Sequence, residues 1–300
     1  MYVRDEDALY FTTVPRFEYR HGGFLFPAVS IKRLALDGER FPLEPERVSV
    51  VCEHTRAANG MTLGSRRGLI VCEQGTEFDR AAISRFDLDD RELRPLLEEV
   101  EGLPLNSPND VVMRSDGTIW FTDPSYGHLQ RFKPEPQLPD RVYRYDPRSG
   151  VVAVVTDSPD KPNGLALSPN EGPLYVADSG ANREVGSFYP ERPHEIWAFD
   201  VVAGCRLENE RVFATVSPGF PDGLQVDDAG RVYASSFSGV QVFTPGGELI
   251  GEIRLPGAVN FTWGGREGRI LFITRDNAVW AAELAARGPR TEQQSSTGGG

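Results

Sequence analysis

The 300-residue sequence predicts an all-β fold, a six-bladed β-propeller, from three observations. One pattern recurs along the chain, in which a small polar residue opens an apolar stretch, a Gly or Asp turn follows, and a second apolar stretch completes the unit. Five opening residues fall 50, 54, 59 and 38 residues apart, which is the spacing of four-stranded blades with loops of variable length. The intervening runs are rich in Val, Ile, Tyr and Phe and are bounded by turn residues, whereas helical periodicity is not evident.

The six copies of the pattern can be followed in order. At the N-terminus only the second apolar stretch, residues 8–13, is complete. The third copy is the clearest and runs from Asn109 to Asp123. The openings and second strands of the other copies lie at residues 59–63 and 69–73, 163–167 and 174–178, 222–226 and 232–235, and 260–263 and 270–274. Outer strands are expected at residues 142–146, 151–156, 195–200 and 211–216.

A β-sandwich with turns at similar spacing is the alternative fold. A sandwich would not place the same kind of opening residue in five places, so the propeller is preferred. We expect one propeller domain over residues 1–284. Residues 285–300 turn polar and end in Ser-Ser-Thr-Gly-Gly-Gly, which is typical of a disordered tail.

Composition excludes several classes of function. The formal net charge of −12 argues against binding to nucleic acid or to an anionic membrane, because both need clustered Lys and Arg. The three cysteines, Cys52, Cys72 and Cys205, form no Cys-x-x-Cys pair and are too few for a disulfide framework. The first residues contain no apolar leader, and no apolar run has membrane-spanning length. We therefore expect a soluble cytoplasmic protein that is a monomer or a weak homo-oligomer.

The residues that open the first strand of each unit form the candidate site. The innermost strand of each blade lines the channel of a propeller, so residues at the start of those strands converge near one mouth. Carboxylate and amide oxygens that converge there suit a hard cation such as Ca²⁺ or Mg²⁺. The set is Asn59, Asn109, Asn163, Asp222 and Asn260. Asn-Gly and Asp-Gly are also strong turn signals, so the residues alone leave a metal site and simple chain reversal as alternatives.

Three motifs resemble those of one known family. Asn-Ser-Pro-Asn-Asp-Val-Val at residues 106–112 is followed by Asp-Gly-Thr-Ile-Trp-Phe-Thr-Asp-Pro-Ser-Tyr-Gly at residues 116–127. Pro-Asn-Gly-Leu-Ala-Leu-Ser at residues 162–168 and Pro-Asp-Gly-Leu at residues 221–224 come next. The sequence thus resembles the SMP-30/gluconolactonase/LRE family over nearly its whole length. The resemblance implies a six-bladed propeller with one divalent metal ion in its channel, commonly Ca²⁺, with Mg²⁺, Mn²⁺, Zn²⁺ or Fe²⁺ as alternatives.

Members of this family include gluconolactonases, other aldonolactonases and phosphotriesterase-like hydrolases. By motif, the family's metal ligands correspond to Asn163 and Asp222, and Asn109 corresponds to a residue at or beside the metal. The family's Glu ligand from the first blade has no counterpart, because the matching position falls just upstream of Met1. A fourth strand for the sixth blade is also not found. We therefore expect that the natural reading frame begins upstream, with divergence from the family pattern as the alternative.

The resemblance and the residues together predict a metal-dependent hydrolase that opens a sugar lactone. Asp222 is expected to bind the metal and to accept the proton of the attacking water. Asn109, Asn59 and His128 are expected to contact the substrate. His128 stands near the start of a loop rich in Pro and charge, residues 131–141, which is a candidate lid for the channel mouth.

Other side chains have simpler interpretations. Trp120 and Phe121 are expected in the blade core rather than as sugar platforms. Glu53, His54 and Glu73 are interpreted as exposed strand ends. No Gly-x-Ser-x-Gly elbow is present, which argues against a serine hydrolase. The alternatives to a lactonase are an esterase or phosphotriesterase of the same family, and a non-catalytic propeller that serves as a binding module.

Overall fold

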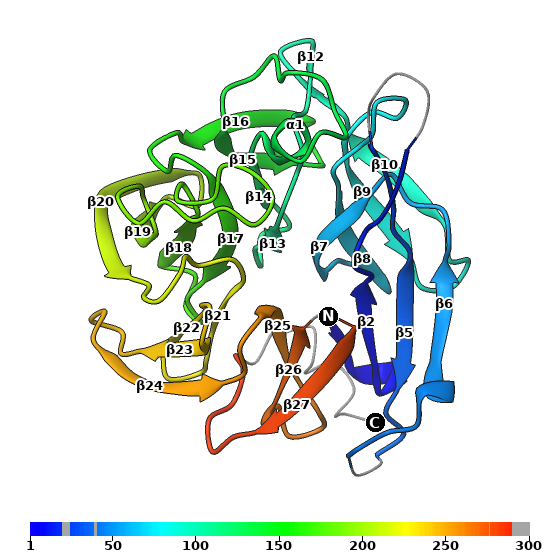
Figure 1. The fold of residues 1–300 in the computed structure, drawn as a ribbon, viewed down its shortest axis with the longest axis vertical. Helices are drawn as coiled ribbons and strands as arrows, with labels where there is room; N and C mark the ends of the chain where they lie inside the picture. Colours follow the sequence, from blue (N-terminus) through cyan, green and yellow to red (C-terminus); the bar gives the residue numbers. More distant parts are fainter. Residues whose placement is uncertain (20–24, 39–40, 276, 290–300) are drawn as a thin grey trace.

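The computed structural model describes residues 1–19, 25–38, 41–275 and 277–289, and within them nearly all of the regular secondary structure is β-strand. Six antiparallel sheets stand around a central channel (Figure 1), and the first strand of each sheet lies innermost. The predicted all-β, six-bladed β-propeller is confirmed. Within each blade the strands are hydrogen-bonded in sequence order.

The first three blades contain four strands each. Blade 1 consists of β1 (Tyr2–Val3), β2 (Ala8–Thr12), β5 (Ile31–Ala35) and β6 (Val48–Cys52). Blade 2 consists of β7 (Ala58–Leu63), β8 (Gly68–Glu73), β9 (Ala82–Asp87) and β10 (Leu93–Leu97). Blade 3 consists of β13 (Val111–Met113), β14 (Ile119–Asp123), β15 (Arg141–Asp146) and β16 (Val151–Thr156).

The last three blades complete the circle. Blade 4 consists of β17 (Pro162–Leu167), β18 (Pro173–Asp178), β19 (Glu195–Val202) and β20 (Arg206–Thr215). Blade 5 consists of β21 (Leu224–Val226), β22 (Val232–Ser235), β23 (Gly239–Phe243) and β24 (Leu249–Arg254). Blade 6 has three strands within the described residues, β25 (Ala258–Gly264), β26 (Ile270–Arg275) and β27 (Ala278–Glu283).

The remaining elements are short and lie between these strands. Two hairpins pair β3 (Arg16–Tyr19) with β4 (Leu25–Ala28) and β11 (Glu99–Val100) with β12 (Leu103–Pro104). The helical turns are η1 (Arg4–Glu6), η2 (Pro45–Arg47) and α1 (Tyr126–Leu129). Among the described residues, no helix combines the length and the apolar character that crossing a membrane requires.

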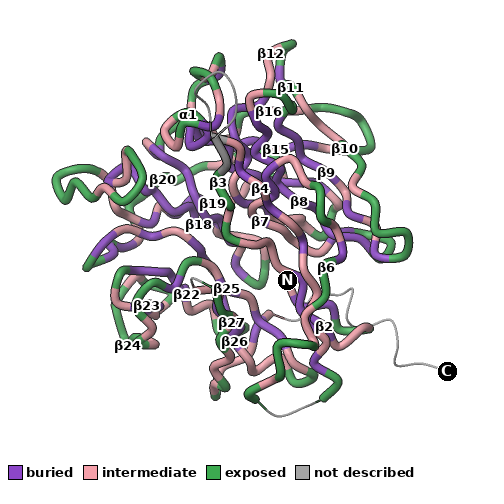
Figure 2. Tube along the Cα trace, turned by 45° about the vertical axis from the view of Figure 1, so that its right-hand side comes forward, coloured by how far each residue is buried: buried purple, intermediate pink, exposed green. Residues whose placement is uncertain are grey.

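The hydrophobic core lies between the blades. Trp120 and Phe121 are fully buried, as expected, and Trp120 belongs to the apolar cluster that also contains Leu165 of blade 4. The first and last blades meet through Tyr2 and Phe272, whose ring centroids lie 6.4 Å apart. Figure 2 shows the resulting gradient, because the inner strand β8 is buried throughout whereas the outermost strand β24 is almost wholly exposed. Each blade therefore buries its inner strands against its two neighbours.

Both ends of the described chain pack against the propeller. Tyr2 pairs with Leu9, so the first residues form the innermost strand of blade 1. At the other end, the carbonyl of Arg287 accepts a hydrogen bond of 2.8 Å from the N–H of Asp228. Residues 285–289 of the expected tail are thus described, while residues 290–300 lie outside the described part of the chain.

Candidate functional site

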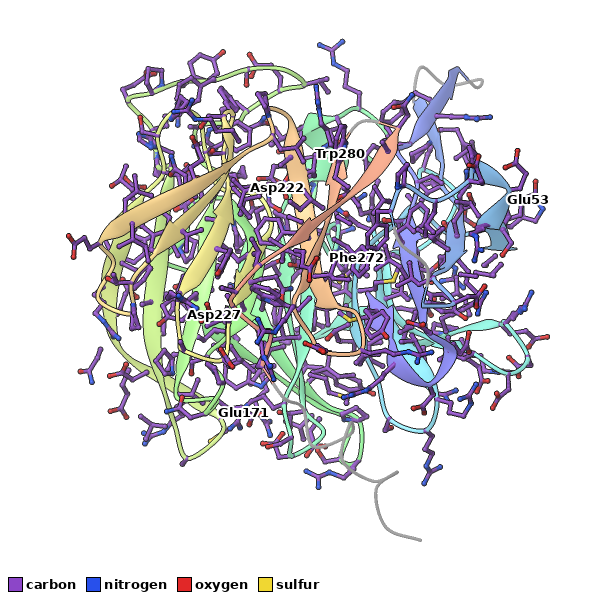
Figure 3. All side chains as sticks on the ribbon, turned by 90° about the horizontal axis from the view of Figure 1, so that it is seen from below. Glu53, Glu171, Asp222, Asp227, Phe272 and Trp280 are labelled. Carbon is purple, nitrogen blue, oxygen red and sulfur yellow. The ribbon has the colours of Figure 1, made fainter. Side chains whose placement is uncertain are left out.

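The five opening residues come together at one end of the channel. Asn59 and Asn163 are the second residues of β7 and β17, Asn260 is the third residue of β25, and Asn109 and Asp222 lie two residues before β13 and β21. Backbone hydrogen bonds join neighbouring openings, from Gly60 N–H to the Asn109 carbonyl (2.8 Å) and from Gly164 N–H to the Asp222 carbonyl (3.0 Å). Figure 3 shows Asp222 toward one end of the propeller and Glu171 toward the other. The convergence that the repeat predicted is therefore present.

The glycines that follow the openings are needed because neighbouring blades approach each other closely there, not because the chain reverses. Asn59-Gly60 and Asn163-Gly164 lie inside strands, at irregular positions in the pairing of β7 and β17. A Cβ on Gly164 would clash with the carbonyl of Asp222, and one on Gly60 would clash with Asn109 and Asp110 of the next blade. Gly223 stands equally close to Asn260. Simple turn chemistry is therefore the wrong interpretation of these pairs, since only glycine lets neighbouring openings touch.

Buried carboxylates hold the segments that lead into three of the openings. Glu73, Asp123 and Asp178 are the last residues of the second strands of blades 2, 3 and 4. Each accepts backbone hydrogen bonds of 2.7–3.0 Å. Glu73 accepts from the N–H of Arg56. Asp123 accepts from those of Asn106 and Ser107, and Asp178 from those of Asp160 and Lys161. The interpretation of Glu73 as an exposed strand end is wrong, because its side chain is only 2% exposed and ties down the segment before Asn59.

The Asn163 side chain is fixed in one orientation. Its Nδ2 donates to Ser179 Oγ at 3.0 Å and to the Tyr126 hydroxyl at 3.4 Å. Ser179 Oγ in turn donates to the carbonyl of Pro221, next to Asp222. Asn163 Oδ1 is buried and has no hydrogen-bond partner among the described residues. A buried amide oxygen without a partner is costly unless something electropositive meets it, so this atom is available as a cation ligand.

Asp222 is the charged member of the set. Its backbone N–H donates to Ser235 Oγ at 2.9 Å, and its carboxylate accepts no hydrogen bond from the part of the chain that the structure describes. Burial raises the pKa of Asp222 to about 7, and the nearby charge of Asp110 adds to the shift. A bound cation would offset both effects, because it favours the ionised form. The donor set of Asn163 and Asp222 thus fits a hard divalent ion.

Asp110 is a further buried carboxylate, and the sequence did not single it out. Its oxygens accept from the N–H groups of Val111 (3.0 Å) and Leu165 (3.3 Å). Burial raises its pKa to about 6, although these two N–H groups oppose the shift. Its only sequence signal is its place directly after Asn109. Asp110 therefore adds negative potential beneath the openings and bridges blades 3 and 4.

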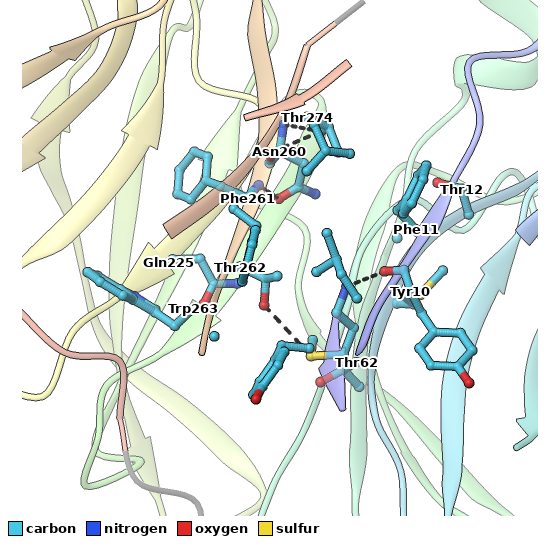
Figure 4. A pocket seen from close by; sticks show the side chains of 18 of the residues that line it. Tyr10, Phe11, Thr12, Thr62, Gln225, Asn260, Phe261, Thr262, Trp263 and Thr274 are labelled. Carbon is cyan, nitrogen blue, oxygen red and sulfur yellow. Dashed lines mark hydrogen bonds between the residues drawn. The ribbon is translucent and has the colours of Figure 1, made fainter. Parts of the chain in front are cut away.

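The central cavity lies beside these residues. It has a volume of about 2700 Å³ and is lined by Asn59, Asp110 and Asn260, but not by Asn109, Asn163 or Asp222. Polar side chains further along its wall include Thr62, Gln225 and Thr262 (Figure 4). The Asn260 amide oxygen accepts from the N–H of Phe261 at 2.8 Å, so it is already partnered. The cavity is large and polar enough in its lining to admit a small hydroxylated molecule.

The expected lid begins in an anchored segment. His128 is exposed on α1, and its imidazole makes no hydrogen bond within the described residues. Phe132 is buried, and Lys133 Nζ donates to the carbonyls of Gln74 (2.9 Å) and Leu105 (3.2 Å). Burial lowers the pKa of Lys133 to about 8. This segment is therefore fastened to blades 2 and 3, and a substrate contact of His128 stays a prediction.

The side chains at the openings offer mainly amide oxygens to a metal ion, with Asp222 as the one carboxylate. Within the residues that the structure describes, no three His, Cys, Asp or Glu side chains gather closely enough to hold a metal ion. The remaining histidines offer no alternative: His54 is exposed, His194 bonds the Val216 carbonyl at 3.1 Å through Nδ1, and His21 lies outside the described residues. One carboxylate with neutral oxygen donors is a set that favours Ca²⁺ or Mg²⁺ over thiophilic ions.

Comparisons with known proteins indicate the family and the fold of the chain. The model of the SMP-30/Gluconolactonase/LRE-like region matches residues 30–277. A gluconolactonase of Zymomonas mobilis is 30% identical over 234 residues, which cover 74% of this chain and 62% of that protein. The lactonohydrolase oryH of Aspergillus oryzae is 35% identical over 171 residues, covering 52% of this chain and 36% of the relative. The chain thus spans less than two thirds of the length of these relatives.

A solved structure is similar over most of both chains. It is a gluconolactonase from Xanthomonas campestris, with 32% sequence identity and a TM-score of 0.71. The superposition covers 93% of this chain and 88% of the other.

Proposed function

Because the chain belongs to the SMP-30/gluconolactonase/LRE-like family, we propose that it is a metal-dependent lactonase that hydrolyses a sugar lactone to the hydroxy acid. The observation that carries the proposal is the buried Oδ1 of Asn163, which has no hydrogen-bond partner among the described residues, next to Gly164, whose N–H donates to the Asp222 carbonyl. The relatives named gluconolactonase and lactonohydrolase support the same reaction class.

The metal would be held by Asn163 and Asp222, with Asn109 as a third oxygen donor, and Ca²⁺ is the preferred ion. A divalent cation supplies the positive charge that polarises a carbonyl group and lowers the pKa of water. Ser179 and Tyr126 fix the amide of Asn163 by accepting from its Nδ2, so its oxygen is the atom left to face a cation. The hydroxyl of Tyr126 stays neutral there, because burial raises its pKa.

The bond changes follow from the positions of the acidic group and the amides. The oxygen of a water molecule bonds to the lactone carbonyl carbon while its proton passes to the Asp222 carboxylate. The bond from that carbon to the ring oxygen then breaks, and the ring oxygen takes the proton from Asp222 to become the hydroxyl of the product, which regenerates the carboxylate. Asn59 and Asn109 do not titrate, so their role is to hold the oxygens of the substrate.

The proposal also covers the class of substrate, the cellular compartment and the oligomeric state of the protein. The substrate is a small molecule rather than nucleic acid or a membrane, which the net charge of −12 supports. Three free cysteines, Cys52, Cys72 and Cys205, support a reducing cytoplasmic setting. We further propose a monomer or a weak homo-oligomer.

The test measures hydrolysis of a panel of aldonolactones. The reaction is monitored through the acid that it releases in a weakly buffered solution. We expect turnover that stops after treatment with EDTA and returns when Ca²⁺ is added. Repeating the reactivation with Mg²⁺, Mn²⁺ and Zn²⁺ ranks the ions. Turnover that is indifferent to chelation, or no lactone turnover with any of these ions, would contradict the proposal. Hydrolysis of a phosphotriester but of no lactone would place the chain with the family's other hydrolases.

A further inference from the structure

Three phenylalanine rings form an exposed cluster on the face that carries the openings. The ring centroids of Phe188 and Phe237 lie 5.2 Å apart, those of Phe220 and Phe237 5.3 Å, and those of Phe188 and Phe220 6.3 Å. Phe188 is 36% exposed and Phe237 is 46% exposed, although both rings contact other aromatics. We call Phe188, Phe220 and Phe237 the aromatic patch.

The aromatic patch is directly connected to Asp222. Phe220 precedes Asp222 by two residues, which places their Cα atoms at most about 7 Å apart. Phe237 follows Ser235 by two residues, and Ser235 Oγ accepts the N–H of Asp222 at 2.9 Å. The N–H of Phe237 also donates to the carbonyl of Pro218 at 3.1 Å. Two of the three rings therefore stand on segments that also position the Asp222 backbone.

The third ring stands on a loop that is fastened to Asn163. Residues 179–194 begin at Ser179, whose Oγ accepts from the Asn163 amide. The base of the loop is closed by a hydrogen bond of 2.7 Å from Ala181 N–H to the Pro193 carbonyl, and Arg183 forms an ion pair with Asp160. Phe188 is therefore held by the same structure that orients the Asn163 oxygen.

The size of the aromatic patch favours a small apolar group over a protein partner. Three Phe side chains bury roughly 450–750 Å² in total when fully covered, and these are already partly covered. A standard protein interface buries about 800 Å² on each partner, so the patch alone offers too little surface. An exposed aromatic cluster on a soluble protein often marks a binding site, and this one adjoins the candidate catalytic carboxylate.

We propose that the aromatic patch is a subsite for an apolar substituent, an alkyl chain or an aryl ring, carried by the lactone substrate. The inference rests on the proposed lactonase function and narrows its substrate class. A lactone bound at Asp222 would extend its substituent over blades 4 and 5. There the three phenylalanine rings would shield the substituent from water. Lactones with such a substituent are then hydrolysed with a higher kcat/KM than an unsubstituted lactone. The reason is that binding of the non-reacting substituent contributes free energy that stabilises the transition state.

The test compares δ-lactones that share one six-membered ring. δ-Valerolactone has no substituent, δ-decalactone carries a pentyl chain, and glucono-δ-lactone carries hydroxyl groups. The variants are Phe188→Ser and Phe237→Ser, with Phe78→Ser as the matched control, because Phe78 is 63% exposed and lies on blade 2. We expect each patch variant to lower kcat/KM for δ-decalactone about tenfold and to leave δ-valerolactone unchanged.

Three results would overturn the subsite. One is an equal loss for both lactones in the patch variants, which would mean that the rings only hold the loops. Another is a wild-type protein that does not favour δ-decalactone over δ-valerolactone. The third is a dimer in sedimentation that the patch variants convert to monomer, which would identify the patch as a contact between copies of this chain.

A binding measurement separates failure of the subsite from failure of the proposed function. A δ-lactam with the same pentyl chain lacks the ester bond, so calorimetry with it needs no turnover. Weaker binding to Phe188→Ser but not to Phe78→Ser supports the subsite even if no lactone is hydrolysed. Equal binding to both variants, or no binding to the wild-type protein, overturns it.

Discussion

Ser179 Oγ accepts a hydrogen bond from Asn163 Nδ2 at 3.0 Å, and with the Tyr126 hydroxyl it leaves the amide oxygen of Asn163 without a partner among the described residues. An amide can present either its oxygen or its NH₂ group, and only the oxygen binds a cation. The hydroxyl of Ser179 also donates to the carbonyl of Pro221, so it links the Asn163 strand to the segment that carries Asp222.

Ser179→Ala is therefore expected to weaken divalent-metal binding without unfolding the protein. Loss of an outer partner of a metal ligand usually costs about 10–100-fold in affinity, and we expect a loss in this range. Calorimetric titration of the metal-free protein with CaCl₂ measures the effect. Ser168→Ala is the control, because Ser168 is also buried but bonds Asn170 just beyond the other end of β17. An unchanged dissociation constant in Ser179→Ala would remove this contact from the site.

Asp222→Asn is expected to abolish lactone hydrolysis while the propeller stays folded. The change keeps an oxygen donor but removes the only carboxylate among the openings, and general-base losses are of the order of 10²–10⁴-fold in rate. Initial rates with an aldonolactone and circular dichroism of the same sample check both parts. Asp228→Asn is the matched control, since Asp228 is exposed on the same blade. Near wild-type turnover in Asp222→Asn would exclude Asp222 as the proton acceptor.

Gly164→Ala is expected to disturb the site and the fold together. The new Cβ would clash with the carbonyl of Asp222, which forces blades 4 and 5 apart at the mouth. Overpacking of this kind costs about 1–3 kcal/mol of unfolding free energy. Urea unfolding measures the loss, with Gly251→Ala as the control, because a Cβ there meets nothing within 4 Å. Equal stability of the two variants would show that the blades can separate without cost.

The stability of the metal-free protein is expected to fall as the pH rises from about 4 to about 6, and Asp110 is one cause. Its pKa is raised from 3.8 in the unfolded chain to about 6 in the folded one. Between these values the folded state keeps a proton that the unfolded state has lost, so each step up in pH favours unfolding. Below about pH 4 both states are protonated and the penalty vanishes.

Asp110→Asn removes this titration, so its unfolding free energy should fall less over the same range. The difference between wild type and variant should grow by up to about 3 kcal/mol from pH 4 to pH 7, at about 1.4 kcal/mol per pKa unit. Urea unfolding at the two pH values, in the presence of EDTA, gives the comparison. Parallel pH dependence of the two proteins would show that Asp110 ionises in the folded state as it does in water.

The repeat predicted more of the site than the individual residues did. The repeat placed Asn163 and Asp222 among five openings, which a propeller brings to one end of its channel, and the family resemblance indicated these two as metal ligands. The pairs Asn59-Gly60 and Asn163-Gly164 were open to interpretation as turns, since the same dipeptides reverse chains elsewhere. Their position inside β7 and β17 became clear only when the neighbouring blade was in place.

What the sequence by itself determined was the all-β propeller, its blade order and the polar residues that head the inner strands, because these follow from periodicity along the chain. Only the tertiary structure decided that Ser179 and Tyr126 orient Asn163, that Glu73 is buried, and that Phe188 meets Phe220 and Phe237. These contacts join residues that are not neighbours in the sequence, so local secondary-structure propensity cannot predict them. They form because adjacent blades pack closely enough for one loop to satisfy the polar groups of the next.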